Sequence, residues 1–151
     1  MLLIAAIPIA LAGWSPGLAV IGAIVVVVAL ALAFVDWRRS PRLDARDVRR
    51  VADPQLSLGA PNPISVTLRD PFGRGLRIRI RDEAPVSFRV DRRAATLHVP
   101  AGGEASLDYV AWPRFRGTFR FGDVHLRTIG PLDLVERQSV ARAAAPANVY
   151  P

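Results

Sequence analysis

The chain has 151 residues, a formal net charge of +7 and no cysteine. This length allows one domain of ordinary size with an appendage. The absence of cysteine excludes disulfides, thiolate zinc sites, iron–sulfur clusters and cysteine nucleophiles. Every charged residue lies from Asp36 onward. The chain therefore divides into an apolar N-terminal part and a charged remainder that must fold in water.

Residues 1–36 are predicted to form a transmembrane helical hairpin. The apolar run at about residues 17–36 approaches the roughly 20 residues that cross a bilayer as a helix. Trp14 and Trp37 bracket this run, and aromatic side chains favour the headgroup region. The run before it, residues 2–13, is too short to cross alone. A re-entrant piece and the remainder of a first span both fit it, and the Trp-Ser-Pro-Gly turn that follows favours a hairpin.

Residues 37–50 are predicted to form a basic juxtamembrane linker, broken at Ser40-Pro41. Six arginines and three aspartates lie between residues 36 and 50. This excess of positive charge predicts that the rest of the chain faces the cytoplasm, at the bacterial inner membrane. A cleaved signal peptide is the alternative, but a basic n-region is absent and the apolar stretch is too long. The residues expected at the membrane interface are Trp14, Trp37, Arg38 and Arg39.

Residues 51–151 are predicted to form an all-β, immunoglobulin-like β-sandwich. Apolar and polar residues alternate in several short runs, which is typical of strands with one buried and one exposed face. Gly- and Pro-rich turns separate about seven such strands, all antiparallel in appearance. No helical stretch of three turns follows the linker. The predicted inward positions are Ile64, Val66, Leu68, Leu76, Ile78, Ile80, Ala95, Leu97, Val99, Leu107, Tyr109, Phe119, Phe121, Val124 and Leu126.

The sequence favours a protein that is not an enzyme and needs no cofactor or metal. It contains no nucleophile elbow, phosphate-binding glycine loop or zinc-protease motif. Only His98 and His125 could act as near-neutral bases, and both occupy predicted exposed positions. Asp123 and His125 share one strand face, which is a weak signal for a metal site.

A basic stripe formed by Arg77, Arg79 and Arg81 raises the possibility of nucleic-acid binding. The inward neighbours of these arginines are what a strand core requires, so a solvated face is favoured over nucleic acid. Four aspartates at positions 70, 82, 91 and 108 are expected to pair with such arginines across strands.

The favoured function is protein interaction. Aromatic and cationic residues meet in the stretch from Trp112 to Arg116, where an aromatic side chain can anchor a contact. Packing at the edge of the core is the alternative for each aromatic residue. The candidate partner contacts are Trp112, Arg114, Phe115 and Arg116.

Two stretches carry a resemblance to a known family. They are Gly117-Thr118-Phe119-Arg120-Phe121-Gly122-Asp123-Val124-His125-Leu126-Arg127 and Pro131-Leu132-Asp133-Leu134. The chain resembles the bacterial membrane-protein family called "domain of unknown function 58". Its members have two membrane helices, a β-sandwich with a similar first stretch and a P-L-G-L stretch, and then a von Willebrand A-like domain. Here Asp133 replaces the glycine.

The resemblance implies a MoxR-type AAA+ ATPase as partner. No metal-adhesion motif of the A-like domain occurs in the chain, so we expect an N-terminal fragment of a longer protein. The predicted function is a membrane-anchored, non-catalytic scaffold or adaptor. The alternative is an exported β-sandwich that binds a cell-envelope ligand.

Overall fold

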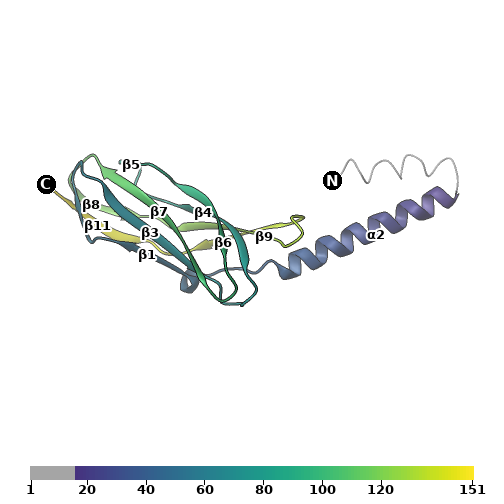
Figure 1. Cartoon of the computed structure of the whole chain (residues 1–151). Coiled ribbons are helices and arrows are strands. Elements are labelled where there is room, and N and C mark those ends of the chain that lie inside the picture. Colours follow the sequence, from purple (N-terminus) through teal and green to yellow (C-terminus); the bar gives the residue numbers. More distant parts are fainter. Residues whose placement is uncertain (1–15) are drawn as a thin grey trace.

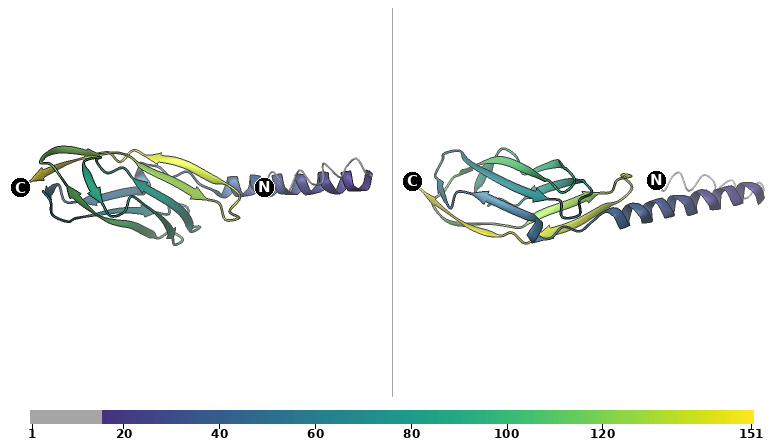
Figure 2. Two further views of the ribbon diagram at one scale, coloured as in Figure 1. Left: turned by 90° about the horizontal axis from the view of Figure 1, so that it is seen from above. Right: turned by 60° about the horizontal axis from the view of Figure 1, so that its bottom comes forward.

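The computed structural model describes residues 16–151. A single helix projects from one end of an elongated β domain, and the C-terminus lies at the opposite end (Figure 1). The two further views in Figure 2 show the same arrangement. Trp14 and the first arm of the predicted hairpin lie outside the described residues.

The helix α2 runs from Pro16 to Arg39, slightly longer than the predicted span. Most of its apolar side chains face outward, away from the sandwich. It ends at the predicted break, where the Ser40 hydroxyl donates a hydrogen bond of 2.8 Å to the Asp36 carbonyl. Pro41 then has no N–H with which to continue the helix.

The strands form three sheets around one core. The first has the order β1-β3-β7-β5, with β1 Val48–Ala52, β3 Asn62–Arg69, β7 Glu104–Pro113 and β5 Phe88–Val90. The second has the order β10-β9-β4-β6, with β10 Glu136–Ala141, β9 Val124–Ile129, β4 Leu76–Asp82 and β6 Ala94–Val99. The third has the order β2-β11-β8, with β2 Gln55–Ser57, β11 Ala145–Tyr150 and β8 Gly117–Phe121.

The second and third sheets are joined by one long hairpin with a break in each arm. β8 continues into β9 after residues 122–123, and β10 continues into β11 after residues 142–144. In the half nearer the helix, β9 pairs with β4. In the far half, β11 pairs with β2 in parallel. The expectation that all strands are antiparallel was wrong at this one ladder.

The core confirms the predicted alternation. The predicted inward residues of β3, β4, β7 and β9 are all buried, whereas Phe119 on β8 and Ala95 and Leu97 on β6 are only partly buried and pack against the core. The sandwich, however, begins before residue 51. A short 3-10 helix, η1 (Ala45–Asp47), leads directly into β1 at Val48, and Leu43 is already buried in the core. The basic segment is therefore packed against the sandwich over much of its length.

Arg50 fills the break in the long hairpin. Its Nη2 donates a hydrogen bond of 3.0 Å to the Gly122 carbonyl, and its Nη1 donates one of 2.6 Å to the Ala143 carbonyl. Both carbonyls lie in the breaks, where the strand ladder leaves them needing another donor. Because Arg50 comes from β1 in the first sheet, its guanidinium ties the two layers together.

The counter-ion of Arg50 is Asp82, at the end of β4. Arg50 Nε lies 3.1 Å from Asp82 Oδ2, and its Nη2 pairs with Oδ1. The Tyr109 hydroxyl from β7 donates to Oδ2 over 2.7 Å. Burial and the adjacent Asp82 charge raise the pKa of Tyr109 well above its usual value, so it remains a donor. We call Arg50, Asp82 and Tyr109 the interlayer cluster.

Candidate functional site: the junction of helix and sandwich

The carboxylate of Asp36 joins the last turn of α2 to the loop between β9 and β10. This side chain is fully buried. Its Oδ1 accepts a hydrogen bond of 2.8 Å from the Leu132 N–H. Its Oδ2 accepts bonds of 2.9 Å from the N–H groups of Leu134 and Val135. A carboxylate held by three backbone donors fixes the loop and the helix end to each other.

Two backbone positions give the loop its shape. A Cβ atom at position 130 would overlap the Asp36 carboxylate, so Gly130 allows the close approach. Asp133 has φ +58°, in the left-handed region. Asp adopts this region more readily than most residues. An aspartate therefore forms the left-handed turn in the stretch Pro131-Leu132-Asp133-Leu134.

Arg137 on β10 makes a second attachment. Its Nη1 donates a hydrogen bond of 2.9 Å to the Ser40 carbonyl. Its guanidinium carbon lies 4.8 Å from the centre of the Trp37 ring, in cation–π geometry. Trp37 remains half-exposed beside Arg38, whose guanidinium lies over the Phe34 ring. The helix end is therefore held at two places, by the loop and by β10.

The outer face of the second sheet is cationic. Register places Arg77 opposite His98, Arg79 opposite Arg127, and Arg81 opposite His125. Three of these groups approach a carboxylate: Arg77 pairs with Asp133, Arg127 lies 3.9 Å from Glu136, and His125 lies 3.8 Å from Glu83. Within residues 16–151, Arg79 and Arg81 pair with no carboxylate.

The expected pairing of four aspartates with this stripe was wrong. Asp82 belongs to the buried interlayer cluster. Asp91 accepts a hydrogen bond from the Val110 N–H. Asp108 lies on β7 in the other sheet. Asp70 accepts bonds at a turn instead. The stripe therefore keeps more of its positive charge than the sequence indicated.

Asp70 shapes the turn between β3 and β4. Its carboxylate accepts hydrogen bonds of 2.9–3.1 Å from the N–H groups of Phe72, Arg74, Gly75 and Gly102. Desolvation by burial opposes ionisation, but these four donors outweigh it and hold the pKa of Asp70 below its usual value. This arrangement fixes the turn that carries the Arg74 side chain.

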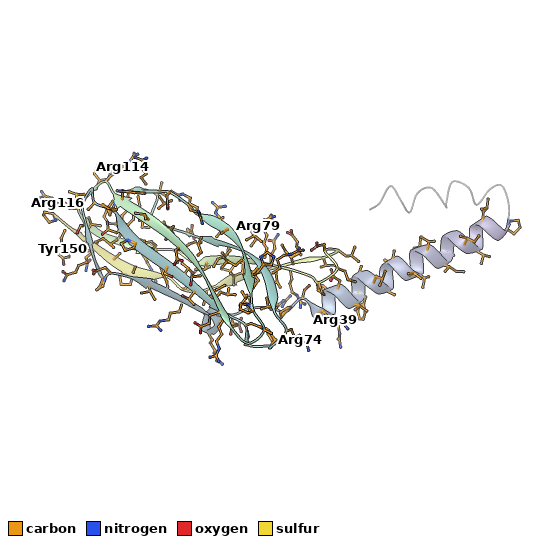
Figure 3. All side chains as sticks on the ribbon, in the orientation of Figure 1. Arg39, Arg74, Arg79, Arg114, Arg116 and Tyr150 are labelled. Atoms are coloured by element: carbon orange, nitrogen blue, oxygen red, sulfur yellow. The ribbon has the colours of Figure 1, made fainter. Side chains whose placement is uncertain are left out.

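A cavity of about 740 Å³ opens at the junction. Three arginines from separate elements line it, Arg39 from α2, Arg74 from the fixed turn and Arg77 from β4, and His98 from β6 adds an imidazole. Figure 3 shows Arg39 and Arg74 at the end of the sandwich nearest the helix. A second cavity of about 410 Å³ lies farther along the same face and includes Arg79 and Arg81 in its lining.

The predicted partner contacts lie at the end of the sandwich far from the helix, where Figure 3 labels Arg114 and Arg116. Arg114 and Phe115 line a hollow of about 380 Å³ together with Val86. Phe115 is 64% exposed and Val86 is 97% exposed. Trp112 does not line this hollow itself but adjoins it, because Arg89, which lines the hollow, has its guanidinium 5.6 Å from the Trp112 ring centre. Arg116 does not line the hollow.

Sequence reasoning missed Val86, Gly130 and the role of Asp36. Val86 lies between Pro85 and Ser87 in a loop, outside any alternating run. A lone apolar residue in such a place is a sequence signal of an exposed apolar side chain. The role of Asp36 depends on residues 96 to 99 positions later. His98 is exposed and His125 lies about half-exposed, as predicted. No group of three or more potential metal ligands occurs in the part of the chain that the structure covers.

No family model matches the sequence, and no curated protein matches it. Solved structures give weak likenesses. A CARDB domain from Pyrococcus furiosus is 15% identical, covering 68% of this chain and 89% of that one, with a TM-score of 0.46. SSP-19, an MSP-domain-like protein of Caenorhabditis elegans, is 11% identical, covering 67% and 99%, with a TM-score of 0.41.

The cupredoxin domain of amoB from Nitrosocaldus yellowstonii is 12% identical, covering 73% of this chain and 91% of its own, with a TM-score of 0.42. With TM-scores below 0.5, none of these three likenesses carries an argument about the fold, ligands or partners of this chain.

Proposed function

We propose that this chain is a membrane-anchored, non-catalytic adaptor. In this proposal α2 crosses the bacterial inner membrane, and the sandwich stands on the cytoplasmic surface as a docking module. The observation that carries the proposal is the Asp36 junction. Three backbone hydrogen bonds to a buried carboxylate hold the domain in one orientation relative to the helix, which a domain on a flexible tether would not need.

The anchor is supported by the helix itself. It has 24 residues and is long and apolar enough to cross a membrane, although a signal sequence would pass the same test. Arg38 and Arg39 follow the apolar part, as the positive-inside rule requires of a cytoplasmic end. The exposed rings of Trp37 and Phe34 lie in the last turns, where aromatic side chains favour the headgroup region.

The docking surface is the hollow at the far end. Exposed apolar groups of Val86 and Phe115 lie beside the guanidinium groups of Arg89, Arg93 and Arg114. This combination suits a partner segment with apolar and acidic side chains. The resemblance to the "domain of unknown function 58" family suggests a MoxR-type AAA+ ATPase, or the A-like domain of the same protein, as that partner.

Membrane topology is tested by fusing alkaline phosphatase after Pro151 and fractionating the cells. We expect the uncleaved chain to resist alkaline extraction from membranes and the phosphatase to be inactive, because it folds only outside the cytoplasm. A shortened, released chain with active phosphatase would contradict the proposal and favour an exported sandwich that binds an envelope ligand.

Docking is tested by binding the full chain in nanodiscs to a purified MoxR-type ATPase from the same genome. We expect Phe115→Asp to weaken binding at least tenfold, because an anchor is lost and a charge is buried. Val51→Asp, an exposed valine on β1, is the matched control and should bind as the parent does. Equal binding by all three proteins would contradict the assigned surface.

A further inference from the structure

The cavity at the junction gathers positive charge from three separate parts of the fold. Arg39, Arg74 and Arg77 bring three guanidinium groups into its lining, and His98 adds an imidazole. The nearby carboxylate of Asp133 pairs with Arg77. In the described part of the chain, the side chains of Arg39 and Arg74 pair with no carboxylate. The lining therefore has an excess of positive charge.

The backbone positions that carry these side chains are fixed by the fold. Asp70 holds the turn that carries Arg74 through four backbone hydrogen bonds. The strand register places Arg77 beside His98. The Asp36 junction fixes the last turn of α2, which carries Arg39. Side chains that are already positioned lose less entropy when an anion binds.

The chemistry of this lining suits a phosphate group. Guanidinium groups bind phosphate oxygens through paired, charge-assisted hydrogen bonds. The cavity of about 740 Å³ is much larger than one phosphate group requires, so the ligand should carry further groups beside its phosphate.

The location of the cavity indicates the source of that phosphate. Arg39 is the last residue of the helix that we propose crosses the bilayer. At the same end of the sandwich, exposed apolar side chains of Trp37, Phe72 and Leu132 lie on three separate elements. Exposed rings and aliphatic groups around a cationic cavity are typical of a surface that contacts headgroups.

We propose that this cavity binds the phosphate of an anionic phospholipid headgroup, with Arg39, Arg74 and Arg77 as its ligands. This inference rests on the membrane anchor of the proposed function. It adds a lipid-specific site where the helix meets the sandwich, formed by the last residue of the helix together with Arg74 and Arg77, which lie far from it in sequence. The bound headgroup would hold the domain against the bilayer at a second point beside the Asp36 junction.

The test uses the full chain in detergent, with retained lipid counted by native mass spectrometry. We expect phosphatidylglycerol to be retained and phosphatidylcholine to be lost at equal concentration. The variant Arg74→Gln/Arg77→Gln should lower phosphatidylglycerol binding about tenfold or more, since it removes two charge-assisted contacts.

The matched control is Arg79→Gln/Arg81→Gln. It removes the same amount of charge from β4, the strand that carries Arg77, but from the lining of the second cavity, and should bind lipid as the parent does. An equal loss in both double variants would show general surface attraction and overturn the site. Arg39 is exposed at the end of the helix, so Arg39→Gln provides a second test if Arg74→Gln/Arg77→Gln fails to fold. Undiminished lipid binding by Arg39→Gln would also overturn the proposal.

A second arm separates the two sources of phosphate. Glycerol 3-phosphate or inorganic phosphate at millimolar concentration should leave the lipid bound. Displacement of the lipid by either one would show a site for soluble phosphate and overturn the lipid assignment. Failure of the anchor itself is read separately, from the alkaline extraction and fusion experiment, because lipid binding in detergent does not require the helix to cross a membrane.

Discussion

The two ends of the sandwich are built in opposite ways. At the end near the helix, the buried carboxylates of Asp36 and Asp70 bind seven backbone N–H groups between them and fix two loops. At the far end, Val86 and Phe115 leave apolar surface exposed around a shallow hollow. The near end is organised to hold one geometry, whereas the far end offers a surface for another protein.

The interlayer cluster lies between the two ends, and the largest effect is expected there. Asp82→Asn leaves the Arg50 guanidinium buried without its counter-charge, and breaking a buried pair in this way costs about 3–5 kcal/mol. We expect a loss of that size in the free energy of unfolding, measured by urea denaturation of the full chain in detergent. Arg79→Gln, an exposed change on the same strand, should leave stability within about 0.5 kcal/mol.

A smaller loss for Asp82→Asn, near that of the exposed control, would mean that the two halves of the long hairpin are held mainly by apolar packing. The structure of each end would then be independent of the cluster between them.

The second effect concerns orientation. Asp36→Ala removes the acceptor for three backbone N–H groups, and each one left without a partner costs about 1–3 kcal/mol. Because the chain has no cysteine, spin labels at Leu30→Cys and Ser106→Cys can report the distance between helix and sandwich. We expect a narrow distance distribution in the parent and a broad one in Asp36→Ala. The control Asp108→Ala should keep the distribution narrow. A narrow distribution in Asp36→Ala would contradict the prediction and show that Arg137 alone is enough to hold the sandwich in its orientation relative to the helix.

The third effect concerns the backbone conformation of the loop between β9 and β10. Asp133→Val places a β-branched residue at φ +58°, which costs about 1–2 kcal/mol. We expect this variant to widen the same distance distribution partly, whereas Asp133→Gly keeps it narrow because glycine tolerates that conformation. If both variants widened it equally, the ion pair with Arg77, rather than the backbone conformation, would be the important feature.

The smallest effect is a dependence on pH. The pKa of Asp70 is lowered in the folded state, so folding favours its ionised form. Its contribution to stability is complete well above the usual value of about 3.9 and is lost as pH falls through the folded pKa. The stability difference between the parent and Asp70→Asn should therefore shrink between about pH 5 and pH 2.5, measured by urea denaturation. A stability difference that stays constant over this pH range would contradict the role given to the ionised Asp70 carboxylate. Asp108→Asn is the control and should show no such change in its difference from the parent.

Sequence reasoning predicted the strands whose apolar residues alternate, because burial of one sheet face demands that pattern. It missed β1, where a polar residue takes the inward position and an apolar residue the outward one. Arg50 points inward and Val51 is half-exposed, since the cluster requires a guanidinium in the interior. One signal was present: Asp82 continues the inward series of Leu76, Ile78 and Ile80, and a carboxylate at such a position needs a buried partner.

The candidate site was less predictable, because its residues come together only through the fold. Arg39 and Arg77 were both recognised as basic, but their shared cavity depends on how α2 meets β4. The Asp36 junction could not be inferred from local pattern, since backbone N–H groups carry no sequence signature. Trp112 was grouped with Phe115 because the two are close in sequence. Only Phe115 lines the hollow, however, whereas Trp112 contacts Arg89 at its side.

The order in which the ribosome makes this chain gives the interlayer cluster a further consequence. Arg50 emerges early, but its acceptors at Gly122 and Ala143 are 72 and 93 residues later. β2 likewise waits for β11, the last strand. These contacts of β1 and β2 therefore cannot form until residue 143 and β11 have been synthesised. A helix synthesised before them has that interval in which to enter a bilayer.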